Sequence, residues 1–362
     1  AVQGFCLPER MGADGRYGLL AVCSLICSLW LKGCADDQSA WTFAQRNSGR
    51  SSGNIQTTPV LRNVKVFFGT DSGKMYAVDS TDGTVAWEFS AADAIQSSPT
   101  VSRRHVFFGS NDRKIYAIRE DNGEYVWHFT TQGRVLSPPT ISNNLVFVGS
   151  SDWRLYALDE VDGKKVWEFR TEAAVHCSPV VFNLIVYFGS LDGKLYAVSA
   201  LAGELVWEFD AGSSIKSSPA LDDGKIFFGS DNGTFYAVSE FDGSLVWTFQ
   251  TEAPIQSAPL ISEGLIFFGN DDGAFYALES IGSRVVERWR FNASSQIRSF
   301  RPSGDGPLVF FGCEDGHVYG CRHEDGEQMY HYVSNGPVRA APLWHNNKLY
   351  FGSDTFYAVD DS

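Results

Sequence analysis

A glycine that closes an aromatic run recurs along most of this chain at a nearly fixed spacing. The runs read VFFG, VFVG, VYFG, IFFG or LYFG, and successive glycines lie 40 residues apart except for one interval of 43. The eight glycines are Gly69, Gly109, Gly149, Gly189, Gly229, Gly269, Gly312 and Gly352. A constant period of about 20–50 residues indicates a repeat fold, in which each unit buries its apolar face against the next unit.

Each repeat divides into four short segments with strand character. In the second repeat these segments are 97–102, 105–110, 114–119 and 125–130, rich in β-branched and aromatic residues. Short turns separate them, and most of the middle turns carry Gly in the third place, as in Leu191-Asp192-Gly193. Four strands in about forty residues are typical of a propeller blade. The sequence therefore predicts an all-β fold, an eight-bladed β-propeller of four-stranded blades.

The two ends of the repeat array complement one another. The eighth repeat ends after its third strand, at Tyr357-Ala358-Val359-Asp360, and lacks a fourth. Upstream of the first repeat, Trp41-Thr42-Phe43 matches the Trp-x-Phe of the other fourth strands. We predict that 41–43 pairs with 356–359 and closes the ring, which removes exposed sheet edges. The expected domains are a linker over 35–55 that contains this closing strand, and a propeller over 56–362.

The segment before the linker has the pattern of an export signal. Residues 17–31 form fifteen uncharged, mostly apolar residues, flanked by Arg16 and Lys32. This length suits the apolar part of a signal peptide better than a membrane span. Leu31-Lys32-Gly33-Cys34 resembles a bacterial lipobox, so Cys34 is a candidate for lipidation; an ordinary cleaved signal or an uncleaved anchor is the alternative. Residues 1–34 are therefore expected to consist of upstream residues and a signal peptide or lipoprotein signal. This signal is expected to direct the protein to the periplasm or cell envelope, tethered to the membrane.

Charge and cysteine content exclude several classes of function. The formal net charge of −14 disfavours nucleic acid as a partner. Cys177, Cys313 and Cys321 lie in the body of the chain without zinc-site spacing, so no metal site is expected. In the predicted register Cys313 faces His317 and Cys321 faces Val309, which leaves the sulfurs too far apart for a disulfide. We expect free, packed thiols.

The repeats also carry a recognisable motif. Residues 77–87 and 157–167 read as AxDxxxGxxxW, while other repeats keep Ala, Gly and Trp but replace the Asp. This pattern resembles the tryptophan-docking motif of the PQQ-like repeat family, over residues 41–362. The resemblance implies that the tryptophans are structural and pack between neighbouring blades, with Tyr330 in place of the seventh. The tryptophans concerned are Trp41, Trp87, Trp127, Trp167, Trp207, Trp247 and Trp289.

That family contains two functional branches. Quinoprotein dehydrogenases bind PQQ and calcium, and they carry long insertions and a pair of adjacent cysteines. The other branch consists of non-enzymatic propellers such as the BamB type of outer-membrane assembly lipoprotein. This chain has no Cys-Cys pair, and its insertions total three residues within the one long interval. We therefore expect a non-enzymatic envelope scaffold without cofactor or catalytic residues. The alternative is a PQQ-binding dehydrogenase or a small-molecule sensor.

Binding residues are expected where the repeat is irregular, because the regular positions serve packing. The position three residues before each repeat proline varies, and it is expected to open the innermost strand at the mouth of the central channel. It holds Gln56, Gln96, Leu136, His176, Lys216, Gln256, Ser299 and Arg339, with Arg298 nearby. The cationic members suggest an acidic peptide or a small anion as ligand; a solvated rim without ligand is the alternative.

A second irregularity lies in the middle turns of the third and fourth repeats. Trp153 occupies a turn position where packing does not require an indole, and tryptophan is common at interface hot spots. We predict that Trp153, Arg154 and Leu191 form part of a docking patch for an envelope protein on a monomeric propeller. The alternative is that Trp153 folds back onto its own blade.

Overall fold

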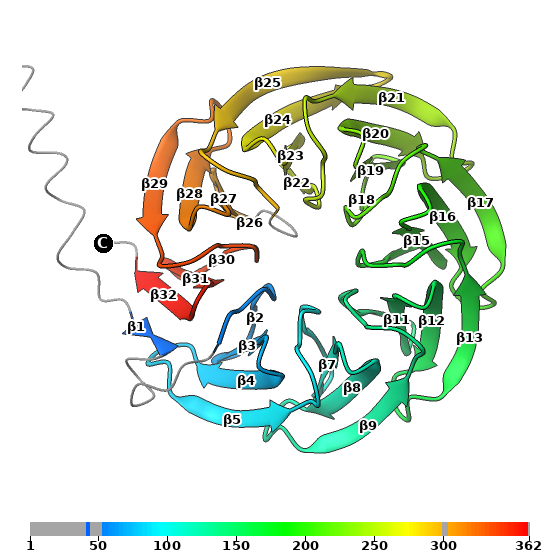
Figure 1. The fold of residues 1–362 in the computed structure, drawn as a ribbon. Helices are drawn as coiled ribbons and strands as arrows, with labels where there is room; N and C mark the ends of the chain where they lie inside the picture. The colour runs from blue at the N-terminus through cyan, green and yellow to red at the C-terminus, as the bar shows by residue number, and fades with distance from the viewer. Residues whose placement is uncertain (1–40, 44–52, 299–302, 361–362) are drawn as a thin grey trace, which may run out of the picture. The chain divides into compact units, whose positions relative to one another are not determined.

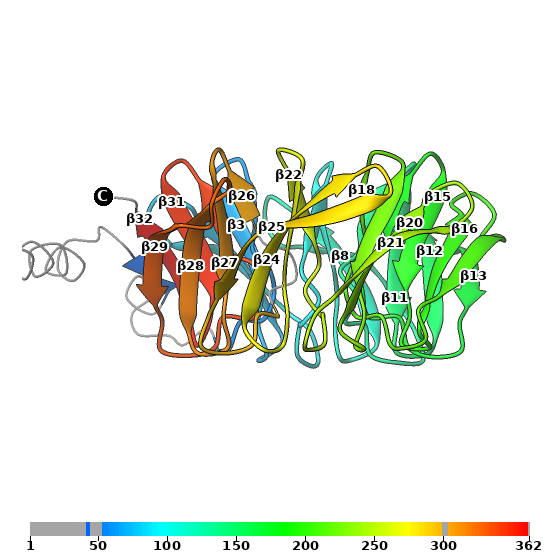
Figure 2. The same cartoon turned by 90° about the horizontal axis from the view of Figure 1, so that it is seen from above.

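The computed structural model describes residues 41–43, 53–298 and 303–360. These residues form eight four-stranded antiparallel sheets, which are arranged as blades around a central axis (Figure 1). The predicted all-β, eight-bladed β-propeller is confirmed. Seen from the side, the strands run between two faces of the ring (Figure 2). Among the described residues, no helix is long and apolar enough to cross a membrane.

Within each blade the strands follow one another from the axis to the rim. The innermost strands are β2 Val60–Arg62, β6 Thr100–Ser102, β10 Thr140–Ser142, β14 Val180–Phe182, β18 Ala220–Asp222, β22 Leu260–Ser262, β26 Ser303–Asp305 and β30 Leu343–His345. The second strands are β3 Lys65–Gly69, β7 His105–Gly109, β11 Leu145–Ser150, β15 Ile185–Gly189, β19 Lys225–Gly229, β23 Leu265–Gly269, β27 Leu308–Gly312 and β31 Lys348–Gly352.

The third and fourth strands complete the blades. The third strands are β4 Lys74–Asp79, β8 Lys114–Arg119, β12 Arg154–Asp159, β16 Lys194–Ser199, β20 Thr234–Ser239, β24 Ala274–Ile281, β28 His317–Arg322 and β32 Phe356–Asp360. The outermost strands are β5 Val85–Ser90, β9 Tyr125–Thr130, β13 Lys165–Arg170, β17 Leu205–Asp210, β21 Leu245–Gln250, β25 Arg284–Asn292, β29 Gln328–Val333 and, in the eighth blade, β1 Trp41–Thr42.

The eighth blade combines both ends of the chain. Strand β1 pairs antiparallel with β32, with Trp41 opposite Ala358 and Thr42 opposite Tyr357. The predicted closing strand is therefore confirmed. A second junction lies nearer the axis, where the Ile55 amide donates to the Ser353 carbonyl at 2.8 Å. Ile55 is buried against the first and eighth blades.

The periodic glycines lie where neighbouring blades approach most closely. A Cβ atom added to Gly229 would lie 2.2 Å from Ile255 Cγ2, and the other seven glycines meet an equivalent Ile or Val in the same way. Apolar cores form between each pair of neighbouring blades, as in the cluster of Trp167, Val175 and Phe188. The forty-residue glycine period therefore reports a close contact that is made once per blade.

The tryptophans of the outer strands lie between neighbouring blades. Trp167 packs on Gly203 of the next blade, and its Nε1 donates to the Ala200 carbonyl at 3.0 Å. Trp41 packs on Gly83 in the same way across the ring closure. In the seventh blade Tyr330 takes this position and packs against Phe310 and Trp344. Corresponding Nε1 hydrogen bonds are made by Trp87, Trp127, Trp207, Trp247 and Trp289.

The innermost strands are shorter than predicted. In the second blade β6 begins at Thr100, and residues 97–99 precede it. Pro99 has no amide hydrogen for a sheet. Ser97 and Ser98 instead bind other blades, since Ser97 Oγ donates to the Ser137 carbonyl and Ser98 Oγ accepts from the Thr58 amide. The segment before each innermost strand thus links blades around the axis.

The cysteine predictions are confirmed. Val309 pairs with Cys321, and the Cys313 amide donates to the His317 carbonyl. Cys177, Cys313 and Cys321 are free and buried. The predicted signal segment 17–31, the lipidation candidate Cys34 and linker residues 35–40 and 44–52 lie outside the described residues.

Candidate functional site

The segments that precede the innermost strands meet at one mouth of the central channel. A cavity of about 310 Å³ there is lined by Gln56, Gln96, Leu136, His176, Lys216, Gln256, Arg298, Glu314 and Arg339. All seven polar residues proposed for the mouth therefore come together. They lie before the innermost strands and do not open them. Each follows a buried Ile or Val that packs on a repeat glycine, so alternation along the chain turns the next side chain toward the axis.

The seventh blade places Arg298 at this mouth. Ile297 packs on Gly269 as Ile255 packs on Gly229, which makes Arg298 the equivalent of Gln256. Counting back from Pro302 fails because the additional residue follows Arg298. Ser299 lies outside the described residues.

The cations of the mouth are paired with carboxylates from the turns between second and third strands. Lys216 Nζ lies 2.8 Å from Asp231, and Arg339 Nε donates to Glu314 at 2.8 Å. Arg298 binds Asp271 through two hydrogen bonds of 2.7 and 2.8 Å. Such bidentate pairs hold a guanidinium in place. A positively charged mouth was expected, but each of its three permanent cations is already compensated, which weakens its attraction for an anion.

The other half of the mouth is rich in amides, two of which donate to a carboxylate. Gln56 and Gln96 both donate to Asp71, and Asn111 donates to Gln96. His176 Nε2 lies 3.0 Å from Ser151 Oγ. Burial, and secondarily the charge of Lys216, lower the pKa of His176, so its imidazole is neutral at pH 7.

The described residues do not assemble a metal centre at this mouth. No group of three or more His, Cys, Asp or Glu side chains among them is placed to hold a metal ion. Burial raises the pKa of the Cys177 thiol to about 12, so this cysteine is protonated at neutral pH and is a poor nucleophile. The chemistry of the mouth is hydrogen bonding and ion pairing.

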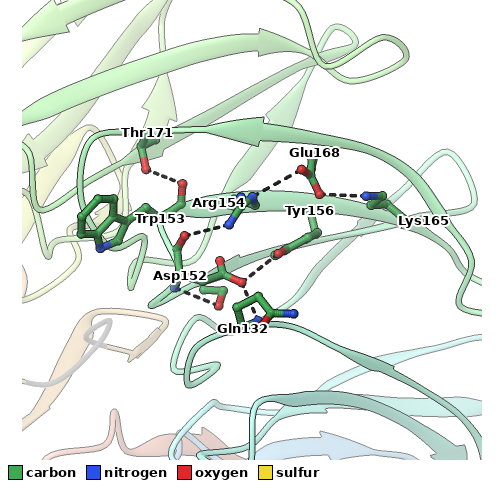
Figure 3. A network of polar contacts seen from close by, with 9 residues as sticks. Gln132, Asp152, Trp153, Arg154, Tyr156, Lys165, Glu168 and Thr171 are labelled. Atoms are coloured by element: carbon green, nitrogen blue, oxygen red, sulfur yellow. Dashed lines mark hydrogen bonds and ion pairs between the residues drawn. The ribbon is translucent and has the colours of Figure 1, made fainter.

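Trp153 lies on the same face, in the turn between β11 and β12. Its backbone φ is +70°, in the left-handed region, where five other blades have glycine. The Trp153 amide donates to the Ser150 carbonyl, and its carbonyl accepts from both the amide and Oγ1 of Thr171. These bonds hold the strained backbone in place. The indole is 47% exposed and points away from the neighbouring polar network (Figure 3).

The residues around Trp153 fix the turn. Asp152 accepts from the Tyr156 hydroxyl at 2.8 Å and from the Gln132 amide of the preceding connection (Figure 3). Arg154 donates to the Asp152 carbonyl and forms an ion pair with Glu168 at 3.3 Å. Arg154 is thus engaged within its blade, which leaves the Trp153 indole as the free contact surface of this turn.

Leu191 occupies a different turn position from Trp153. It is the first residue of the turn after β15, where other blades place Asp71, Asp231 or Asp271. Leu191 is half-buried, and its carbonyl accepts from Ser214 Oγ. Leu191 therefore occupies the turn position that Glu314 takes in the seventh blade, but only Glu314 of the two lines the cavity at the mouth.

Sequence reasoning missed an exposed group on the opposite face, which we call the apolar corner. It consists of Phe182, Leu184, Leu201 and Phe241, which are 46%, 47%, 60% and 76% exposed. The Ala200 amide donates to the Leu184 carbonyl, which brings the two turns of the fourth blade together. Tyr187 and Trp207 both donate to the Glu240 carbonyl, which holds the turn carrying Phe241 against that blade.

The repeat contained a signal for this corner. The turn position that holds Leu201 and Phe241 is Thr81 in the first blade and Asp121 in the second. A single turn with one exposed apolar residue is unremarkable on a protein surface. Only a comparison of the same exposed position across the repeats would have found the apolar corner.

Comparison with protein families gives a match over most of the chain. The family model described as outer membrane protein assembly factor BamB matches residues 34–131, 71–209 and 191–343. These overlapping segments span 34–343, so they include the closing strand and nearly all of the ring. No curated protein sequence matches the chain significantly.

Similar solved structures include BamB, a designed protein and alcohol dehydrogenases. BamB from Moraxella catarrhalis is 19% identical with a TM-score of 0.73, covering 89% of this chain and 96% of that chain. The designed protein Ika8 is 16% identical with a TM-score of 0.77, covering 86% and 97%. Quinohemoprotein alcohol dehydrogenase from Comamonas testosteroni is 12% identical with a TM-score of 0.72, covering 89% and 76%. At these identities the likeness shows the fold alone.

Proposed function

Because the chain belongs to the family of the outer membrane protein assembly factor BamB, we propose that it is a non-enzymatic scaffold of the cell envelope. The observation that carries this proposal is the family match over 34–343, which spans nearly the whole ring. We propose that its partner is a protein of the outer-membrane assembly machinery. The acidic net charge of −14 is consistent with a protein partner and disfavours nucleic acid.

We propose that the N-terminal segment directs the scaffold to the cell envelope. The apolar run 17–31 would direct export, and acylation of Cys34 would tether the ring to a membrane. Metabolic labelling with a fatty-acid analogue tests this tether. We expect label on the wild-type chain and none on Cys34→Ser; equal labelling of both would contradict lipidation at Cys34.

The mouth face around Trp153 is the proposed docking surface. A bulky side chain in the left-handed region costs about 1–2 kcal/mol relative to glycine. Strain of this kind commonly accompanies function, and here it presents an exposed indole. Trp153 is thus proposed as the anchor, with Arg154 shaping its turn and Leu191 extending the contact toward the mouth.

The matched variants are Trp153→Gly and Arg113→Gly. Arg113 occupies the equivalent turn of the second blade with φ +73°, so both changes relieve similar backbone strain on the same face. We expect Trp153→Gly to reduce crosslinking to the assembly-machinery partner in the native envelope. A hot-spot loss of about 2 kcal/mol corresponds to roughly 30-fold weaker binding. We expect Arg113→Gly to leave crosslinking unchanged.

A control on the opposite face makes this experiment decisive. Phe241→Ser removes the most exposed side chain of the apolar corner. If Phe241→Ser abolished crosslinking while Trp153→Gly did not, docking at the mouth face would be refuted. If the wild type itself captured no protein of the assembly machinery, the scaffold role would be refuted.

The alternative is a PQQ-binding dehydrogenase or a small-molecule sensor at the mouth. The fold likeness to quinohemoprotein dehydrogenases and the 310 Å³ cavity favour it. However, a quinone with several carboxylates needs free cations, and Lys216, Arg298 and Arg339 are each paired with an acid. These residues do not fit that cofactor. Incubation with PQQ and calcium, followed by absorbance of the dialysed protein, should show no bound quinone; retained quinone would favour the enzyme.

A further inference from the structure

One pair of positions on the outer part of the blades carries a repeated ion pair. A cation at the start of the third strand contacts an acid that lies diagonally across from it in the fourth strand. Lys74 pairs with Glu88 at 3.1 Å, and Lys194 with Glu208 at 2.8 Å. In the seventh blade the same two positions hold His317 of β28 and His331 of β29. A repeated salt bridge is thus replaced there by two imidazoles.

The two imidazoles converge with a tyrosine hydroxyl. His331 Nε2 lies 3.0 Å from His317 Nδ1, and the Tyr319 hydroxyl lies 3.0 Å from that same Nδ1. A neutral imidazole nitrogen offers either one hydrogen or one lone pair in the ring plane. His317 Nδ1 therefore cannot make good hydrogen bonds to both neighbours. The side chain of His331 is exposed and that of His317 is half-buried, so solvent ions can reach them.

We propose that His317 and His331 form a two-imidazole binding site for a divalent transition-metal ion, with copper(II) or nickel(II) preferred. With metal–nitrogen bonds of about 2.0–2.1 Å, a nitrogen separation of 3.0 Å corresponds to an angle at the metal of about 91–97°. Adjacent ligands in the tetragonal geometry of copper(II) and nickel(II) meet at such an angle. A tetrahedral zinc site would require the nitrogens to be about 3.3–3.4 Å apart.

The surroundings suit a labile site. The described residues contain no group of three His, Cys, Asp or Glu ligands, so water or the Tyr319 hydroxyl would complete the coordination. The site stands independently of the scaffold role.

Titration of the untagged protein with copper(II), nickel(II) and zinc(II) chlorides tests the site. We expect one ion per chain, affinity in the order copper, nickel, zinc, and nitrogen hyperfine splitting in the copper spectrum. The double variant His317→Lys/His331→Glu installs the Lys–Glu ion pair of the first and fourth blades, so it should keep the melting temperature of the wild type. We expect it to bind copper(II) at least tenfold more weakly.

The control variant is His128→Gln. His128 lies opposite Tyr116 as His331 lies opposite Tyr319, but its blade has Lys114 in the position of His317. This change should leave copper binding unaltered. If the double variant bound copper(II) as tightly as the wild type, or if the wild type bound none, the pair would be only a hydrogen bond between strands and the proposal would be wrong.

Discussion

Trp41 is the residue on which closure of the ring depends most. Its side chain is 1% exposed, packs on Gly83 of the first blade and lies 6.0 Å from the Phe356 ring of the eighth. Truncation of a buried tryptophan to alanine costs about 3–5 kcal/mol. Domains are stable by only about 5–15 kcal/mol in total. We therefore expect Trp41→Ala to remove a large part of the free energy of unfolding.

The matched comparison is Trp167→Ala in the middle of the ring. Both changes remove a tryptophan between blades, but the third and fourth blades remain joined by the chain when Trp167 is lost. Strand β1 is held to β32 by only two residue pairs. Loss of Trp41 should therefore also release β1, expose the edge of β32 and promote aggregation.

Urea unfolding followed by circular dichroism measures the expected loss, and amide exchange in β32 reports the release of β1. We expect Trp41→Ala to unfold at lower urea with rapid exchange in β32, and Trp167→Ala to unfold earlier with β32 still protected. If Trp41→Ala unfolded within about 1 kcal/mol of the wild type, well below the cost of a truncated tryptophan, closure by this strand would not hold the ring together.

The hydrogen bonds of these two tryptophans sharpen the comparison. Among the residues that the structure describes, Trp41 Nε1 is buried without a hydrogen-bond partner, whereas Trp167 Nε1 donates to the Ala200 carbonyl. Replacement of Trp167 by Phe leaves a buried carbonyl unsatisfied, at a cost of about 1–3 kcal/mol. Trp41→Phe removes an unsatisfied donor, so it should cost less than Trp167→Phe in the same urea experiment.

Three further outcomes are expected. Gly229→Ala should destabilise the ring by about 1–3 kcal/mol in urea unfolding, because the added Cβ would lie 2.2 Å from Ile255 Cγ2. Gly212→Ala is the comparison without a clash: its Cβ meets nothing within 4 Å, and its cost should be only the roughly 1 kcal/mol of placing alanine at a φ of +71°. The pKa of His176 is lowered in the folded state, so the unfolded chain takes up its proton first as pH falls below about 6.5. The free energy of unfolding should therefore decrease as the pH is lowered through that range. His176→Gln should make the urea midpoint less dependent on pH. Burial raises the pKa values of Cys177, Cys313 and Cys321 to about 12, so peptide mapping after alkylation at pH 8 should find all three unmodified in the native protein and modified in urea.

The fold could be predicted from the sequence because its packing contacts recur once per blade. Gly229 must be small since Ile255 lies against it, and the same contact recurs at Gly352 with Ile55. A requirement repeated eight times leaves a visible period. The closing strand was predictable for the same reason, because Trp41 fills a position that every other blade also fills.

The charge pairing at the mouth of the channel could not be predicted in the same way. Periodicity placed Lys216, Arg298 and Arg339 around the channel, but it did not indicate that turn carboxylates neutralise them. Asp271 lies 27 positions before Arg298 in the chain, and only the blade-to-blade geometry brings the two together. The insertion after Arg298 also obscured which residue of the seventh repeat is equivalent to Gln256. Counting back from the repeat proline cannot show whether the additional residue lies before or after Arg298.

Departures from the repeat differ in what they imply, and the backbone helps to separate them. Arg113 and Trp153 both adopt a left-handed conformation where other blades have glycine, so strain alone does not mark a functional residue. Trp153 differs because its strained turn also exposes an apolar indole to water. Two unfavourable features at one position require a compensating benefit, which a partner outside the propeller would supply. The His317 and His331 pair is a departure without backbone strain, since it replaces one cross-strand contact by another. Its significance therefore depends on whether a metal ion occupies it, whereas that of Trp153 depends on a partner protein.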